Sequence, residues 1–263
     1  MEANLATAGI GLLLAVVLAL PVWAASVPLR DVSIVDRFWS VFIAGPAVFY
    51  GVRLGSDARV GMMLAVLVAW ALRLAWHITR RNWGHGEDRR YREIRARNDP
   101  GFAWKSLWLV FLLQAVLAWV VGLPVLAAAG GGPWQPLDTV GAVLALGGLA
   151  METVADAQLA RFRRQPGSQG RVMDQGLWRW SRHPNYFGET CLWWGLGVMA
   201  VSGGGATHAW ALASPVLMTV LLLRVSGVTL LERDIGERRP QYRDYVARTS
   251  AFIPWPPRRR AGP

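Results

Sequence analysis

The stretch GLWRWSRHPNYFGE, residues 176–189, holds the residue types best suited to binding a charged cofactor. Its candidate ligand residues are Arg182, His183, Asn185, Tyr186 and Glu189. Pro184 interrupts or begins a helix, because proline lacks a backbone N–H and has a fixed φ. We therefore expect Asn185, Tyr186 and Glu189 in the first turn of a helix. Polar groups at a helix N-terminus suit an anionic or amide-bearing ligand.

A second charged segment spans residues 80–104 and predicts a turn followed by an amphipathic or solvated helix. Guanidinium groups bind phosphate bidentately, and carboxylates can bind ribose hydroxyls or orient the arginines. The candidate residues here are Arg80, Arg81, Asn82, Glu87, Asp88, Arg90, Tyr91 and Arg95. A charge run can equally be a solvated face, and spacing alone leaves both interpretations open.

Ionisable residues also lie within or at the ends of apolar runs, where each costs about 2.5–3.5 kcal/mol near a helix centre. These residues are Arg73, His77, Glu152, Asp156, Glu189, Arg224 and Glu232. Residues three or four apart share a helical face, as His77 does with Arg80 and Arg81. Buried ion pairs between helices would explain single residues. A ligand site opening toward the basic loops would explain the whole set.

The elements that position these residues are long apolar runs. Of 263 residues, 53% are hydrophobic and 17% charged, whereas soluble domains carry about 25% charged residues. We predict an all-α polytopic membrane helix bundle, one membrane domain over residues 1–263, with about seven transmembrane helices. The predicted spans are about 5–25, 39–55, 60–79, 105–128, 138–155, 188–203 and 208–230. The first run resembles a signal peptide, but it lacks a basic start and is long enough to span, so we interpret it as the first helix.

The basic residues gather in alternate connections, which are 80–104, 156–187 and the tail 231–263. The positive-inside rule makes that face cytoplasmic and puts the N-terminus outside. The net charge of +11 fits this topology and also cofactor phosphates, while the apolar, Trp-rich sequence argues against nucleic acid as a partner. The histidines have no partners at metal-ligand spacing, so we predict no metal.

The motifs RNWGHGEDRRY, ADAQLARFRRQPG, GLWRWSRHPNYFGE and ERRPQYRDYVARTSAFIPWPP together resemble the bacterial DUF1295 family, which is similar to the membrane steroid 5-alpha-reductase superfamily. The resemblance covers about residues 30–257. It implies a bacterial plasma-membrane enzyme that reduces an activated C=C bond in a lipid such as a 3-oxo-Δ4 steroid. NADPH would supply the hydride from a pocket open to the cytoplasm. Asn185 and Glu189 match the residues that hold the nicotinamide half in those reductases.

The resemblance also implies a cofactor role for Asp156, ahead of RFRR, and for Arg80 or Arg81. With it, we expect Arg164 and Arg182 to bind phosphates beside the arginines of 80–104. The steroid reductases use a Gln-Glu pair on the second helix and a Tyr on the third. This chain has no Gln-Glu dipeptide over 30–55. Asp36 and Trp39 are the nearest polar candidates there, and His77 occupies the expected Tyr position. We predict Asp36 and His77 as the catalytic residues, because a histidine can donate a proton to a developing enolate.

A second class of enzyme fits the same stretch. RHPNYFGE overlaps the RHPxYxG pattern of membrane isoprenylcysteine and phospholipid methyltransferases, which bind S-adenosylmethionine. Arg182, His183 and Tyr186 would then line the cofactor site with Glu232. The many arginines and the RNWGHGEDRRY segment favour the reductase. A non-enzymatic lipid-binding or scaffold protein is the third alternative, and would show a polar cluster closed by internal pairs.

Overall fold

The computed structural model describes residues 2–55, 57–225, 227–228, 232 and 241–258. All the regular elements within these ranges are helices, with no strand among them. This confirms the all-α class. Six helices are long and apolar enough to cross a bilayer, because about 20 residues at 1.5 Å each span its 30 Å core. The chain is therefore a multi-pass membrane protein.

The six candidate spans coincide with six of the seven predicted runs. They are Asn4–Leu29, Val32–Leu54, Ala58–Asn82, Phe102–Ala128, Pro136–Arg163 and Gly205–Val225. The predicted sixth span, 188–203, forms helix α8 (Pro184–Ser202), but α8 is not among the six. Of the predicted last span, residues 226, 229 and 230 lie outside the described residues.

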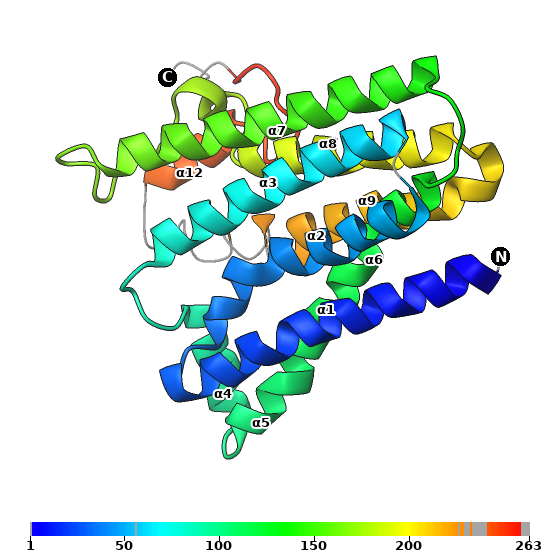
Figure 1. Cartoon of the computed structure of the whole chain (residues 1–263). Coiled ribbons are helices and arrows are strands. Elements are labelled where there is room, and N and C mark those ends of the chain that lie inside the picture. Colours follow the sequence, from blue (N-terminus) through cyan, green and yellow to red (C-terminus); the bar gives the residue numbers. More distant parts are fainter. Residues whose placement is uncertain (1, 56, 226, 229–231, 233–240, 259–263) are drawn as a thin grey trace. The chain divides into compact units, whose positions relative to one another are not determined.

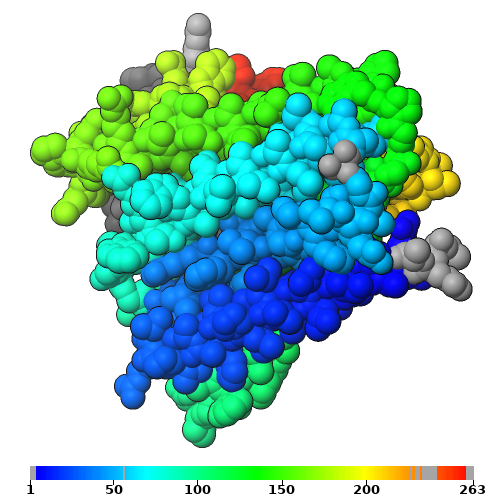
Figure 2. Space-filling model, in the orientation of Figure 1, coloured from blue at the N-terminus to red at the C-terminus, as the bar shows by residue number. Residues whose placement is uncertain are grey.

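The first compact unit of the chain comprises Met1–Asp138 and Met199–Ser214. In it, α2 (Val35–Leu54) packs against α1 (Glu2–Leu29), α3 (Ala58–Asn82) and α6 (Leu113–Ala128) (Figure 1). The blue surfaces of α1 and α2 meet along their length in Figure 2. The α2 core residues Phe42, Ile43, Ala47 and Tyr50 are fully buried, at the spacing of one helical face.

Short elements connect α3 to α6. Asp88 accepts a hydrogen bond from the Arg90 N–H at 2.9 Å and so caps α4 (Arg89–Asn98). Aspartate is a preferred N-cap residue because it satisfies a free N–H of the first turn. The predicted turn followed by a helix is thus confirmed. The chain then continues through α5 (Phe102–Ser106) and the π-helical η2 (Leu107–Leu112) into α6.

A fully buried ion pair joins the start of α3 to the start of α7 in the first unit. Arg59 donates from Nε to Asp138 Oδ1 at 2.7 Å and from Nη2 to Oδ2 at 2.9 Å. Arg59 Nη2 also donates to the Pro133 carbonyl at 3.0 Å. Both charged side chains are 0% exposed. The bidentate geometry and the added carbonyl satisfy donors that burial would otherwise leave unpaired. This pair is not among the site residues predicted from the sequence.

The second compact unit comprises Thr139–Val198 and Pro215–Pro263. It holds most of α7 (Pro136–Arg163) and α8, with glycines where the two helices touch. A Cβ on Gly188 would lie 2.6 Å from the Glu152 N, and one on Gly195 would lie 2.5 Å from the Ala145 N. Only glycine permits this approach of two backbones. Helix α7 extends past the predicted end at residue 155.

The remaining elements of the second unit follow these helices. They are η3 (Gly176–Arg179), the later part of α9 (Ala213–Val220), η5 (Leu221–Val225) and α12 (Gln241–Arg248). As predicted, a helix begins at Pro184, where proline's missing N–H costs nothing. Asn185 and Tyr186 lie in its first turn, and Glu189 lies one turn further on.

Candidate functional site

A largely buried ionic cluster connects the two residues that precede α8, Arg182 and His183, with Glu232. Arg182 donates from Nε to Glu232 Oε1 at 2.7 Å and from Nη2 to Oε2 at 2.8 Å. Glu232 Oε1 also lies 2.9 Å from His183 Nε2. The His183 ring stacks on Tyr186, with 5.6 Å between the ring centroids. The structure therefore brings together four residues that the sequence analysis proposed as ligands.

The charges of this cluster are fixed by its hydrogen bonds. Burial raises the pKa of Glu232, but the hydrogen bonds from His183 and Arg182 and the charge of Arg182 outweigh burial and lower it to about 2. Burial lowers the pKa of Arg182, and Glu232 more than offsets this so that the pKa rises. At neutral pH Arg182 and Glu232 are a charged pair, with each charge largely compensated by the other.

The motifs GLWRWSRHPNYFGE and ERRPQYRDYVARTSAFIPWPP pack against each other in this unit through their described residues. The Arg182 N–H donates to the Ser250 carbonyl at 2.9 Å, and the Trp255 N–H donates to the Trp180 carbonyl at 2.9 Å. Ser181 Oγ donates to the Phe252 carbonyl at 2.7 Å. Backbone pairing of this kind fixes the position of the stretch that leads into α8.

Asn185 and Asp156 form a second contact, between the first turn of α8 and α7. Asn185 Nδ2 donates to Asp156 Oδ1 at 3.0 Å. Because a carboxylate only accepts, this bond sets which way the Asn185 amide faces. Its Oδ1 is buried and has no hydrogen-bond partner among the described residues. Glu152 and Glu189 are also buried in the same unit. A buried acceptor without a donor is costly, so a ligand N–H would be stabilising here.

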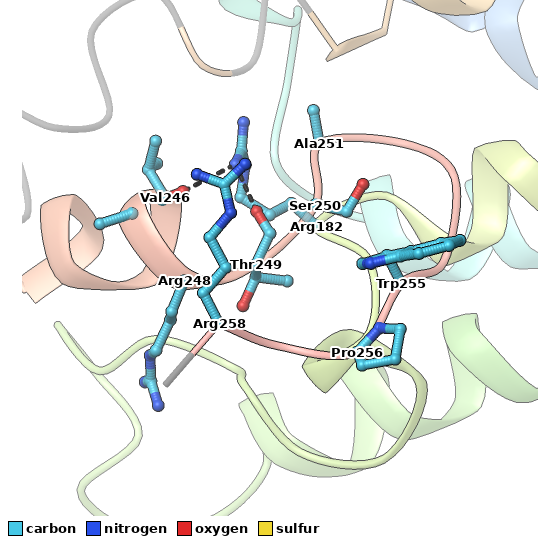
Figure 3. Close-up of a pocket in the computed structure, with 10 residues that line it drawn as sticks. Arg182, Val246, Arg248, Thr249, Ser250, Ala251, Trp255, Pro256 and Arg258 are labelled. Carbon is cyan, nitrogen blue, oxygen red and sulfur yellow. Dashed lines mark hydrogen bonds between the residues drawn. The ribbon is translucent and has the colours of Figure 1, made fainter. Parts of the chain in front are cut away.

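A pocket of about 370 Å³ opens beside Arg182 (Figure 3). Its walls come from Arg182, from the end of α12 and from the tail that follows, including Arg248, Trp255 and Arg258. Arg182 Nη1 donates to the Thr249 carbonyl at 2.7 Å and to the Val246 carbonyl at 3.2 Å. Arg248, Trp255 and Arg258 are not among the site residues predicted from the sequence. The signal for them in the sequence is the aromatic and basic character of the tail.

In the first unit, Asp36 lies at the centre of a polar network. It accepts from Arg90 Nη2 and from the Tyr91 hydroxyl, each at 2.7 Å. Gln114 Nε2 in turn donates to the Tyr91 hydroxyl at 3.1 Å. Burial and the Asp36 charge both raise the pKa of Tyr91. The structure thus connects the proposed catalytic Asp36 with Arg90 and Tyr91.

Glu87 and Arg95 form another pair in this unit. Arg95 Nη2 donates to Glu87 Oε1 at 2.7 Å, and the Val32 N–H donates to the same oxygen at 2.9 Å. Burial raises the pKa of Glu87, but these hydrogen bonds and the Arg95 charge lower it overall. The hydrogen bonds that Arg95 donates to Glu87 raise the pKa of Arg95. Glu87 therefore ties the segment before α4 to the start of the second span.

The other predicted site residues lie on α3 and after α7. His77 lies on α3, and Arg80 and Arg81 are exposed in the last turn of that helix. Arg81 Nε donates to Asn82 Oδ1 at 3.0 Å, and Arg164 is exposed after α7. Of the six arginines proposed for phosphates, three therefore have carboxylate partners and three face outward. No group of three metal-ligand residues occurs among the residues searched, which are those the structure describes.

The fold defines a multi-pass helical membrane protein with buried polar clusters in each of its two units. The chain belongs to the DUF1295 family, described as a protein of unknown function, whose match covers residues 22–249. It is similar to an uncharacterized protein of Schizosaccharomyces pombe, with 25% identity over 93% of this chain and 79% of that protein. No solved structure matches the chain.

Proposed function

We propose that this protein is a membrane-embedded, NADPH-dependent reductase of an activated C=C bond in a lipid such as a 3-oxo-Δ4 steroid. The proposal rests on the similarity of the DUF1295 family to the steroid 5-alpha-reductase superfamily. We further propose that the protein lies in a bacterial plasma membrane, with its N-terminus outside and its C-terminus in the cytoplasm. The lipid substrate would come from the membrane itself.

The observation that carries the proposal is the unpaired carbonyl of Asn185. Asp156 holds the Asn185 amide with its Oδ1 buried and without a donor from the described residues. The carboxamide N–H of a nicotinamide is a donor of the required kind, and Glu189, also buried, lies one helical turn away. These two buried groups of the second unit support the proposal that the amide end of the cofactor binds there. When bound, NADPH supplies the hydride that reduces the β-carbon of the double bond.

The protein's own residues have separate roles in this proposal. Asn185 and Glu189 orient the nicotinamide, and Asp156 fixes the orientation of Asn185. His77 donates the proton that the α-carbon takes up when the enolate collapses, and Asp36 hydrogen-bonds or orients the substrate. Since Arg90 and Arg182 already have carboxylate partners, the exposed Arg80, Arg81 and Arg164 are the arginines of the predicted set best able to reach phosphate.

Titration of the purified protein in detergent with NADPH tests the cofactor assignment. Asn185→Ala should weaken NADPH binding about tenfold or more, since it removes a buried hydrogen-bonding group. Asn98→Ala is the matched control, because among the described residues the Asn98 amide donates to the Ile94 carbonyl alone, within α4. Thermal unfolding without ligand reports whether each variant folds. Equal NADPH affinity in the wild type and in Asn185→Ala would refute the assignment.

An S-adenosylmethionine-dependent methyltransferase is the second candidate, and a specific observation favours it. Arg182, His183 and Glu232 are hydrogen-bonded together, with Tyr186 stacked on His183. These are the four residues that the methyltransferase pattern would place at its cofactor. Titration with S-adenosylmethionine beside NADPH separates the classes. Saturable stabilisation by S-adenosylmethionine alone would replace the reductase with this enzyme.

A further inference from the structure

Among the described residues that line the pocket beside Arg182, one cation has no compensating charge. Arg182 is paired with Glu232, and its other donors reach the Val246 and Thr249 carbonyls. Arg248 is paired with Asp174. The Arg258 guanidinium, by contrast, has no carboxylate partner among the described residues, and the Arg258 side chain is exposed.

The position of Arg258 is set by its backbone. Its N–H donates to the Arg248 carbonyl at 2.9 Å, which folds the tail back onto the end of α12. Figure 3 shows the Arg258 side chain extending to the side where Arg182 lies, while Arg248 points away from it. Glu232 already compensates the Arg182 charge, so the Arg258 guanidinium is the group in this pocket that remains to attract an anion.

We propose that this pocket binds a phosphate group through Arg258, with the rest of the ligand lying on the Trp255 ring. A guanidinium matches phosphate because it offers two parallel N–H donors to two oxygens. The Trp255 side chain is 69% exposed and lines the same pocket with Pro256. Its indole therefore offers a flat apolar surface that a base or an acyl glycerol could cover.

The size of the pocket supports a phosphate ester. Pockets for small organic ligands span about 300–1,000 Å³, and this one, at about 370 Å³, exceeds what a bare ion needs. A nucleotide or a phospholipid headgroup could each supply the phosphate. The proposal does not depend on reductase chemistry, because Asn185 and Asp156 do not line this pocket.

Thermal unfolding of the full-length protein in a neutral detergent tests the proposal with three probes at constant ionic strength. The probes are inorganic pyrophosphate, adenosine 2′-monophosphate and dihexanoyl phosphatidylglycerol, with sodium chloride as the ionic control. Arg258→Gln is the test variant. Arg243→Gln is its matched control, because Arg243 is an exposed arginine on α12 outside the pocket.

We expect saturable stabilisation by at least one phosphate probe, with an affinity about tenfold to a hundredfold weaker in Arg258→Gln and unchanged in Arg243→Gln. A response to adenosine 2′-monophosphate identifies a nucleotide, and a response to phosphatidylglycerol identifies a lipid headgroup. Equal affinities in Arg258→Gln and the wild type, or no saturable response to any probe, would overturn the proposal. Loss of NADPH binding in Asn185→Ala with retained phosphate binding would show that the two sites are separate.

Discussion

Both Arg182 and His183 lie within hydrogen-bonding distance of Glu232, so Glu232→Gln tests the cluster directly. The substitution keeps the shape of the side chain but removes its charge. One glutamine oxygen can still accept from Arg182 or His183, while the NH₂ group faces a donor. The buried Arg182 guanidinium then loses its compensating charge, which is the costly way to break a buried pair.

The magnitude follows from the pKa of Glu232. Its folded value of about 2, against an ordinary 4.5, corresponds to about 3 kcal/mol at ~1.36 kcal/mol for each pKa unit. The side chain is 19% exposed, so solvent screening is limited. Since the folded pKa is the lower one, this stabilisation is fully present above about pH 4.5. It is lost progressively as the pH falls toward 2.

Unfolding in mixed micelles of dodecyl maltoside and SDS, followed by far-UV circular dichroism between pH 7 and pH 3, measures this contribution. At pH 7, Glu232→Gln should unfold about 3 kcal/mol more easily than the wild type, and its stability should fall less steeply with acid. Glu93→Gln is the control, because Glu93 pairs with Arg89 on the exposed face of α4. Its effect should stay below about 1 kcal/mol. A Glu232→Gln protein with wild-type stability at pH 7 and the wild-type acid profile would refute the reasoning.

Two further predictions concern packing and buried charge. Gly195→Ala should destabilise the protein by about 1–3 kcal/mol, since its Cβ would lie 2.5 Å from the Ala145 N. Gly147→Ala should be neutral or stabilising, because no atom of the described residues lies within 4 Å of its Cβ. Comparison of the unfolding midpoints of the two glycine variants in the same mixed micelles tests this prediction, and equal midpoints would contradict it. Asp138→Asn should cost about 3–5 kcal/mol, because it leaves the fully buried Arg59 without a counter-charge; a loss under about 1 kcal/mol would show that water reaches this pair.

The apolar runs predicted the fold because length and hydropathy alone decide whether a helix can cross a bilayer. Six predicted runs coincide with the six candidate spans. The predicted run that is not among the candidate spans is 188–203, which forms α8. Pro184, Asn185 and Glu189 reduce the apolar character of this helix. Its start at proline was nonetheless predictable, and so was the helix after the RNWGHGED segment.

The contacts of the site were less predictable. The sequence identified Arg182, His183 and Glu232 as candidates. It could not show that the Glu232 carboxylate contacts both Arg182 and His183, because Arg182 and Glu232 are 50 positions apart in the sequence. Nor did helical periodicity reveal Arg59 with Asp138, because that pair depends on tertiary packing across 79 positions. The pocket residue Arg258 lies after α12, in an irregular segment to which helical periodicity does not apply. Only the folding of this tail determines which groups the Arg258 side chain faces.

The pairing of Arg59 with Asp138 also has a consequence for how the protein is made. At about 5–20 residues per second, the ribosome completes Asp138 about 4–16 s after Arg59, which lies 79 positions earlier. During that interval the third span carries a guanidinium at its end without its counter-ion, so that end must stay at the hydrated membrane interface. Only when the start of α7 arrives can the charge be buried, so the earlier helices complete their packing only after a later one has been synthesised.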